Sequence, residues 1–385
     1  MTEFDKLVER RGSGSAKWDE AEEGVIPLWV ADMDFPTAPC IIDALRRRVE
    51  HGVFGYTHVM PSYYEALTGW FQRRHGWAID STDVIYTSGV VPAISAILRG
   101  MTKPGDGVIV QSPVYNCFFS SIRNLGCRLA DAPLIYSQQG YSIDFEAFEA
   151  IAKEPWVKMF ILCNPHNPVG RVWTADELRK LGRICIDNDV FVISDEIHCE
   201  LTFNGIEYTP YQSLGQDFAL NSVACVSPTK AFNIAGLQIA NIICPDQEVR
   251  RKVDRGINDN EVCDVNPFGV AALEAAYNRG EGWLDQLRQY LWQNYLLVKE
   301  FMERELPSFP IQPLQGTYLV WIDCRHLGIS SDELSERMKA EARVWLSPGS
   351  IYGTGGQGFM RLNIACQRSR LMEGLERMNN FFKKF

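Results

Sequence analysis

The sequence lacks the long apolar runs and basic blocks that would direct it to a membrane or to nucleic acid. No window in its 385 residues approaches the ~18 uninterrupted apolar residues of a membrane-spanning helix. Its first residues mix both signs of charge and lack the apolar core of a signal peptide. The formal net charge is -10, which argues against a broad basic surface for nucleic acid, and a solvated helix face explains the short basic cluster Arg46-Arg47-Arg48. We therefore expect a cytoplasmic protein that binds neither membrane nor nucleic acid.

Paired cysteines and metal-binding histidine motifs are missing as well. The eleven cysteines are scattered singly, with no C-x-x-C pair and no histidine at a zinc-ligand spacing. Nor do the histidines form an H-E-x-x-H motif. Free, mostly buried thiols in a reducing compartment explain this distribution, and we expect no metal site.

Short β-branched runs alternate with helix-length stretches along most of the chain. The runs lie at residues 107–111, 156–163, 189–194 and 222–226. Between two of them, Thr174-Ala-Asp-Glu177 has the pattern of a capping box and predicts a helix over 174–188. This alternation predicts an α/β fold, with βαβ units and a mostly parallel sheet that is buried on both faces.

The pattern changes near residue 283. A long amphipathic helix continues to residue 305, and strands are predicted at 317–323 and 359–365, with a glycine-rich loop before the second. We expect a smaller α+β domain over 283–385, a large domain over 46–282, and an N-terminal segment, 1–45, that packs with the small domain.

Polar residues follow three of the predicted strands directly. They are residues 164–170, Asp195 and Lys230. Because ligands bind beyond the carboxyl ends of parallel strands, these residues should converge on one site. A fourth segment, Ser88-Gly-Val-Val91 followed by Pro92, predicts a glycine turn that opens a helix, whose free N–H groups favour an anion such as phosphate.

The chemistry of the lysine and the aspartate suggests a cofactor. A desolvated lysine amine loses its proton more easily and can form a Schiff base, although a lysine whose head reaches water is the ordinary alternative. Asp195 ends a buried strand, where a carboxylate is costly unless it meets a cation such as a protonated pyridine nitrogen. A helix cap or an arginine pair would also explain it. Ser227 and Thr229 could add hydroxyl donors for a phosphate beside Lys230.

Six motifs, in order, resemble those of the fold type I pyridoxal-phosphate (PLP) enzymes of the class I/II aminotransferase superfamily. They are Thr87-Ser-Gly-Val90, Pro113-Val-Tyr115, Asn164-Pro-His-Asn-Pro-Val-Gly170, Asp195-Glu-Ile-His198, Ser227-Pro-Thr-Lys230 and Arg361-Leu-Asn-Ile-Ala365. The resemblance covers nearly the whole chain. Three further segments are similar to the MalY/PatB branch of cystathionine β-lyases and C–S lyases: Arg11-Gly-Ser-Gly-Ser-Ala-Lys-Trp-Asp19, Trp29-Val-Ala-Asp-Met-Asp-Phe35 and Gly55-Tyr-Thr57.

The resemblance implies PLP as cofactor and a role for each matching residue. Lys230 would carry the cofactor covalently and act as the base at the substrate Cα, and Asp195 would pair with the pyridinium nitrogen. Asn167 would bind the ring 3-oxygen, and Tyr115 would stack on the ring. The remaining cofactor-binding positions are Gly89, Val90, Val91, His198, Ser227 and Thr229.

Substrate binding and assembly follow from the same resemblance. Arg361 would take the substrate α-carboxylate in a bidentate pair, close to Asn167 and Tyr115. Tyr56 would reach the phosphate of a neighbouring subunit, which implies a homodimer with shared active sites.

Two positions depart from the aminotransferase pattern. His198 stands where aminotransferases commonly have a tyrosine, and Gln238 stands where many have a phosphate-binding arginine. The branch resemblance therefore favours a C–S β-lyase that cleaves L-cystathionine or related cysteine thioethers to a thiol, pyruvate and ammonia by α,β-elimination. An aminotransferase of the same fold and a PLP-binding regulatory protein are the alternatives.

Overall fold

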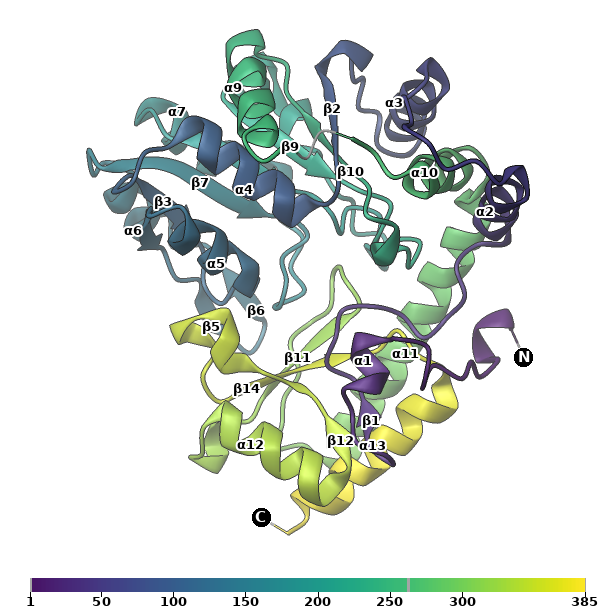
Figure 1. Cartoon of the computed structure of the whole chain (residues 1–385). Helices are drawn as coiled ribbons and strands as arrows, with labels where there is room; N and C mark the ends of the chain where they lie inside the picture. The colour runs from purple at the N-terminus through teal and green to yellow at the C-terminus, as the bar shows by residue number, and fades with distance from the viewer. Residues whose placement is uncertain (1, 262–263, 385) are drawn as a thin grey trace.

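A computed structural model describes residues 2–261 and 264–384, and a seven-stranded sheet forms the centre of its larger part (Figure 1). The strand order is β2-β10-β9-β8-β7-β3-β4, and β10 alone runs antiparallel to its neighbours in this sheet. The strands are β2 (Val84–Thr87), β3 (Gly107–Val110), β4 (Arg128–Asp131), β7 (Val157–Cys163), β8 (Phe191–Asp195), β9 (Ser222–Val226) and β10 (Ala240–Ile243). The predicted α/β fold with a mostly parallel sheet is confirmed.

Helices cover both faces of this sheet, as the unbroken apolar runs of its central strands require. Alternate side chains point to opposite faces: Ile161 packs in one apolar cluster, whereas Phe160 and Leu162 pack in another. One face carries α4 (Val90–Met101), α5 (Asn116–Asn124) and α9 (Gln247–Asn258), and the other carries α6 (Phe145–Ala152), α7 (Ala175–Asp187) and α8 (Gln216–Leu220). The predicted capping box begins α7, where Thr174 and Glu177 bond reciprocally.

The C-terminal part of the chain forms a second, smaller body (Figure 1). It contains the three-stranded antiparallel sheet β11-β14-β13 and two helices. Its elements are β11 (Leu319–Asp323), β13 (Ser347–Pro348), β14 (Phe359–Asn363), α12 (Ser331–Arg337) and α13 (Arg368–Phe382). The long helix α11 (Glu281–Glu305) runs from the large part towards it and begins two residues before the predicted start.

The N-terminal segment packs against this smaller body. Its strand β1 (Ile26–Pro27) pairs in parallel with β12 (Val344–Trp345), and Tyr290 in α11 donates a hydrogen bond to Asp5 at 2.8 Å. The short helix α1 (Ala16–Asp19) belongs to the same segment. The exact boundaries at residues 45 and 282 stay a prediction. Within the described part of the chain, no helix has the length and apolar character needed to cross a membrane.

Three further helices cluster beside the large sheet. These are α2 (Pro39–His51), α3 (Pro61–His75) and α10 (Pro267–Arg279), and α10 packs against both of the others. The linker between α2 and α3, residues 52–60, has no regular secondary structure, and most of its residues are exposed.

Candidate functional site

A cavity of about 190 Å³ lies where the central strands end and α4 begins. Its position, beyond the carboxyl ends of β7, β8 and β9, is the one that parallel sheets offer to ligands. Nine of the predicted residues line it: Gly89, Val90, Val91, Tyr115, Asn167, Asp195, His198, Thr229 and Lys230. The structure therefore brings most of the predicted site together from five segments that are far apart in the sequence.

Lys230 follows β9 in a tight turn, and part of its side chain is open to the cavity. Its Nζ donates a hydrogen bond to the backbone carbonyl of Ala31 at 2.7 Å. Burial, and then the nearby Arg361 guanidinium, lower the pKa of Lys230 to about 8. A neutral amine is thus accessible near physiological pH, as a nucleophile or base requires.

Asp195 is the last residue of β8 and is 4% exposed. One of its carboxylate oxygens accepts a hydrogen bond from the Ile197 amide at 3.1 Å. Burial raises the pKa of Asp195 to about 7, and the adjacent Glu196 contributes in the same direction. Such a carboxylate favours a cationic group inside the cavity, because a positive partner would stabilise its charged form.

The N-terminus of α4 provides an anion site in the cavity wall. Gly89 is its N-cap residue and has no side chain to bond the N–H groups of the first turn. Thr229 lines the cavity beside it. Ser227 lies one layer behind: its hydroxyl donates to the Ile239 carbonyl at 2.6 Å and accepts from the Thr229 amide at 3.1 Å. Ser227 therefore orders the lysine turn and does not line the cavity.

Arg361, on β14, comes from the smaller body to the edge of this site. Its Nη1 donates to Asn167 at 3.0 Å and its Nη2 donates to the Trp29 carbonyl at 2.8 Å. Its buried Nε has no hydrogen-bond partner among the described residues. The guanidinium lies 5.0 Å from the ring centroid of Tyr352. A buried guanidinium with a free donor can accept an anionic ligand.

Two aromatic side chains complete the cavity wall. Burial, followed by the charges of Lys230 and Arg361, places the pKa of His198 well below its usual value, so its imidazole is neutral. Its Nδ1 is buried without a partner among the residues described. Burial likewise raises the pKa of Tyr115, which keeps its hydroxyl protonated.

Tyr56 and Gln238 lie away from the cavity lining. Tyr56, in the linker between α2 and α3, is 95% exposed. Gln238 is also exposed and has a left-handed backbone, with φ of 52°.

The sequence interpretation gave Ala31 no role, although the segment 29–35 stood out in it. Ala31 acts through its carbonyl oxygen, a group that every residue has, so its identity carries no signal.

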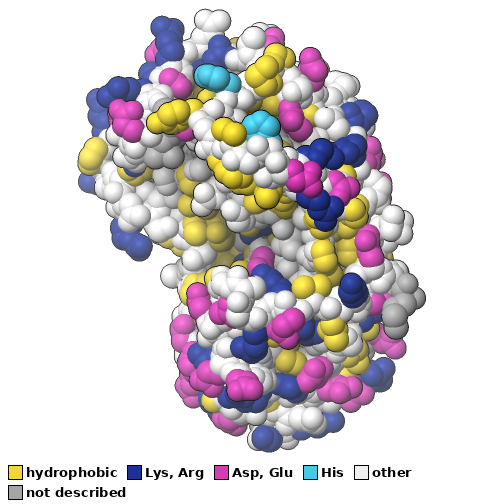
Figure 2. All heavy atoms as spheres, turned by 45° about the vertical axis from the view of Figure 1, so that its right-hand side comes forward, with side chains coloured by type: hydrophobic (Ala, Val, Ile, Leu, Met, Phe, Trp, Pro, Cys, Tyr) yellow, Lys and Arg dark blue, Asp and Glu magenta, His cyan; other side chains and the backbone are white. Residues whose placement is uncertain are grey.

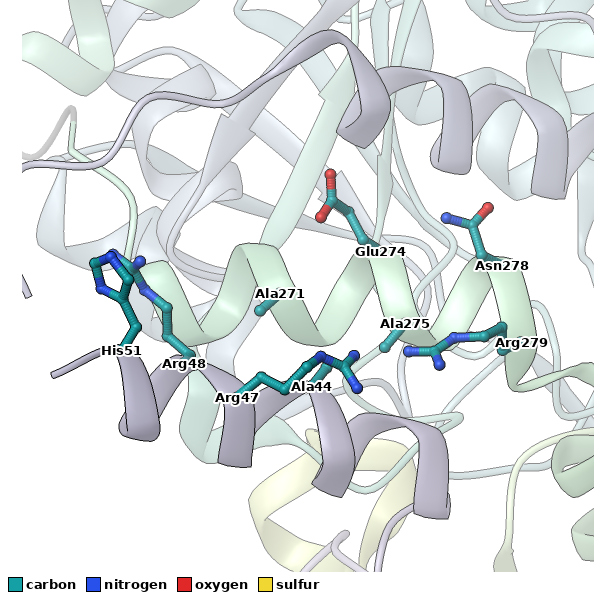
Figure 3. A pocket seen from close by; sticks show the side chains of 9 residues that line it. All are labelled: Ala44, Arg47, Arg48, His51, Ala271, Glu274, Ala275, Asn278 and Arg279. Carbon is teal, nitrogen blue, oxygen red and sulfur yellow. The ribbon is translucent and has the colours of Figure 1, made fainter. Parts of the chain in front are cut away.

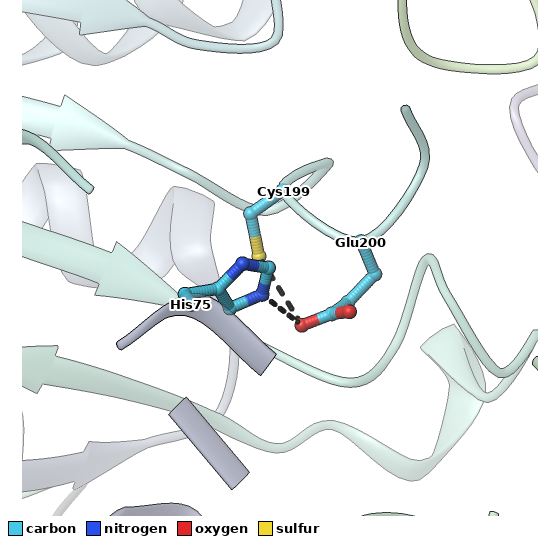
Figure 4. A group of neighbouring side chains, drawn as sticks. All are labelled: His75, Cys199 and Glu200. Atoms are coloured by element: carbon cyan, nitrogen blue, oxygen red, sulfur yellow. Dashed lines mark hydrogen bonds and ion pairs between the residues drawn. The ribbon is translucent and has the colours of Figure 1, made fainter. Parts of the chain in front are cut away.

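Two other features lie apart from this cavity. Within the described chain, His75, Cys199 and Glu200 are one group whose ligand-type atoms lie within 4.8 Å of one another (Figure 4). Glu200 already accepts hydrogen bonds from Trp70 and His75, both at 2.7 Å, and pairs with Arg74 at 3.5 Å. These contacts anchor α3 to the turn after β8.

An open groove of about 440 Å³ lies between α2 and α10, and basic side chains border it (Figure 3).

Comparisons with known proteins agree with this geometry. A model of the family described as aminotransferase class I and II matches residues 23–378. The chain is 44% identical over 380 residues to the cystathionine beta-lyase PatB of Bacillus subtilis, covering 97% of this chain and 98% of that protein. It is 34% identical to the protein MalY of Escherichia coli, covering 99% of this chain and 98% of that protein. Cystalysin from Treponema denticola, whose crystal structure contains pyridoxal 5'-phosphate, superimposes with a TM-score of 0.97 at 36% identity, covering 100% of this chain and 99% of that one. The chain therefore belongs to the class I and II aminotransferase family.

Proposed function

We propose that the protein is a PLP-dependent C–S β-lyase that cleaves L-cystathionine or related cysteine thioethers to a thiol, pyruvate and ammonia. One observation carries the proposal: Lys230, Asp195 and the N-terminus of α4 open into the same cavity. The similarity to a cystathionine beta-lyase over almost the whole chain supports the choice of reaction.

The groups that line the cavity fit PLP. The N–H groups at the start of α4 and the Thr229 hydroxyl suit its phosphate. Asp195 suits the pyridinium nitrogen, because a cation there offsets the cost of burying the carboxylate. Asn167 suits the ring oxygen, and Tyr115 suits the ring face. When bound, PLP would supply an electron sink that stabilises negative charge at the substrate Cα.

The protein's own residues then perform recognition and proton transfer. Arg361 binds the substrate α-carboxylate with its guanidinium fork, one arm of which Asn167 already orients. Lys230 accepts the Cα proton, since its lowered pKa makes the neutral amine accessible. After that proton is lost, the Cβ–S bond breaks and the sulfur departs as a thiolate. The aminoacrylate that remains hydrolyses to pyruvate and ammonia.

The test is the release of pyruvate and free thiol from L-cystathionine by the purified, PLP-loaded protein, with no keto acid present. We expect equal amounts of both products over many turnovers. The Lys230→Ala variant should lose at least ~1,000-fold in kcat, because it has no base at Cα. A reaction that requires an added keto acid would instead identify an aminotransferase.

We also propose a homodimer whose subunits share their active sites. The linker between α2 and α3 and the end of α2 expose a run of apolar side chains. Val49, Val53, Phe54 and Met60 are each more than half exposed, and Tyr56 is almost fully exposed. Figure 2, in which the side that carries these helices comes forward, shows hydrophobic side chains at the surface of the upper part. A second copy of the chain would cover this surface and receive Tyr56.

The cysteines support a cytoplasmic location for this enzyme. All ten described cysteines are free, and seven of them are buried. Unpaired thiols in this number suit a reducing compartment.

A further inference from the structure

Residues 29–35, here named the strap, have no regular secondary structure and pass beside the cavity, which Ala31 lines. Each of the seven strap carbonyls accepts a hydrogen bond from a side chain. The donors are Arg10, Lys230, Asn233, Tyr318, Arg361, Asn363 and Gln367. Because an irregular segment has no strand or helix partners for these groups, side chains must satisfy them.

The donors fall into two kinds. Lys230 and Arg361 belong to the proposed chemistry, and they bond to Ala31 and Trp29, at the start of the strap. The other five take no part in the mechanism proposed above. Asn363, for example, donates to the carbonyl of Asp32 at 2.6 Å. These five side chains therefore fix the strap independently of cofactor and substrate.

The Ala31 carbonyl accepts a hydrogen bond from one donor of each kind. It accepts from Lys230 Nζ at 2.7 Å and from the Tyr318 hydroxyl at 2.8 Å, and a carbonyl oxygen has two lone pairs for these two donors. Tyr318 is 1% exposed, and burial raises the pKa of its hydroxyl, so it remains a donor. The Tyr318 hydroxyl thus holds in place the oxygen to which the lysine amine binds.

We propose that Tyr318 is a positioning residue for Lys230: it fixes the Ala31 carbonyl as the acceptor that holds the amine whenever the amine is free. In the lyase reaction proposed above, the amine is free at the stage when it takes the Cα proton. A flexible four-carbon side chain needs such an acceptor to keep one orientation. The role rests on that proposed function, because it concerns proton transfer at Cα.

The test compares Tyr318→Phe with the wild type, both loaded with PLP, in D2O with L-alanine. L-alanine has no Cβ leaving group, so Lys230 only removes its Cα proton and returns a deuteron, which proton NMR detects. The loss of one hydrogen bond predicts an exchange kcat about five- to tenfold lower, with KM changed less than about twofold. With L-cystathionine, deuterium at Cα should slow the variant more than the wild type, because proton removal becomes more rate-limiting.

A second measurement is independent of activity. In the cofactor-free protein, amide hydrogen exchange of a peptide that contains the strap should be faster in Tyr318→Phe than in the wild type. Tyr63→Phe is the matched control: Tyr63 is also fully buried and donates to Asn241 at 2.7 Å, away from the strap. It should change neither strap exchange nor the isotope effect.

The outcomes separate the two proposals. Unchanged alanine exchange kinetics and unchanged strap exchange in Tyr318→Phe would overturn the positioning role. A wild type that exchanges the Cα proton but releases no thiol would contradict the lyase while the role of Tyr318 is still measured. A wild type that neither exchanges the Cα proton of L-alanine nor releases thiol from L-cystathionine would overturn both.

Discussion

Asp195 and Lys230 show how the site trades stability for function. Both lie where charge is costly, and in both burial is the largest cause of the pKa shift, upward for the carboxyl and downward for the amine. A chain optimised only for folding would place neutral side chains there. The cost therefore indicates that a ligand with complementary charge belongs in the cavity.

Asp195→Asn should stabilise the cofactor-free protein in a pH-dependent way. The folded pKa, about 7, lies above the ordinary value of 3.8, so the wild type binds this proton more tightly when folded. The stabilisation of the folded wild type by this tighter proton binding is fully present below pH 3.8. It falls as the pH rises and is fully lost above about pH 7. Asparagine is neutral throughout, so the Tm advantage of the variant should grow between about pH 4 and 7 and then level off.

Thermal denaturation of the cofactor-free wild type and variant between pH 4 and 8 measures this difference. PLP should reverse its sign, because the loaded wild type gains the pyridinium pair that the variant lacks. A Tm difference that stays constant over this pH range would show that burial does not raise the pKa of Asp195 in the cofactor-free protein.

At the residue scale, the sequence predicted side chains better than backbone contacts. Lys230 and Asp195 could be placed because each follows an apolar strand, and strand ends meet at one edge of a parallel sheet. Ser227 could not be separated from Thr229, because only the turn geometry decides which hydroxyl faces the cavity. The acceptor at Ala31 could not be predicted, since a carbonyl has no sequence signature.

At the scale of elements, the close contact between α4 and α9 fixes the position of α4, the helix whose N-terminus opens into the cavity. A Cβ placed on Gly256 of α9 would lie 2.2 Å from the Ala96 carbonyl oxygen of α4, and one on Gly100 would lie 2.2 Å from the Lys252 carbonyl oxygen. Both contacts are with backbone atoms, which cannot rotate away. These glycines therefore let α9 approach closely along the second half of α4.

Gly256→Ala should push α9 away from α4 and lower the free energy of unfolding by roughly 1–3 kcal/mol, the usual cost of overpacking. PLP affinity should fall as well, because the N-terminus of α4 is the site that we propose for its phosphate. Denaturant titration and cofactor titration measure the two effects. The control is Gly282→Ala in α11, where the added Cβ has no neighbour within 4 Å and helix propensity favours alanine. Equal stability changes in the two variants would argue against a steric cause.

The central strands were predictable because they are apolar on both faces and bounded by polar turns. Four predicted runs correspond to β3, β7, β8 and β9. The sequence interpretation did not identify β2, β4 or β10. The equally short β3 was found because its run is apolar, whereas β2, β4 and β10 include polar residues. The antiparallel course of β10 depends on its two neighbours rather than on its own residues.

At the scale of the whole molecule, the two bodies meet at the active site. Arg361 reaches it from the smaller body, the strap reaches it from the N-terminal segment, and Lys230 lies in the turn that follows β9 of the large sheet. Tyr56 is the predicted site residue that finds no place in this arrangement, and it lies on the apolar surface proposed for dimer formation. The site of one chain is therefore expected to be completed by its partner.

Mixed dimers test this sharing directly. Lys230→Ala removes the base from a subunit's own site, whereas Tyr56→Ala should damage the site of the partner. In a heterodimer of these two variants, one site carries both defects and the other carries none. Random subunit exchange should thus restore about one quarter of the wild-type lyase activity from two nearly inactive parents, because half of the dimers are mixed and each has one intact site.

The matched control mixes Lys230→Ala with Asp195→Ala, two defects that each lie in their own subunit's site, and it should restore nothing. If the Tyr56 mixture also recovers nothing above the sum of its parents, while sedimentation confirms mixed dimers, then Tyr56 acts within its own chain or not at all.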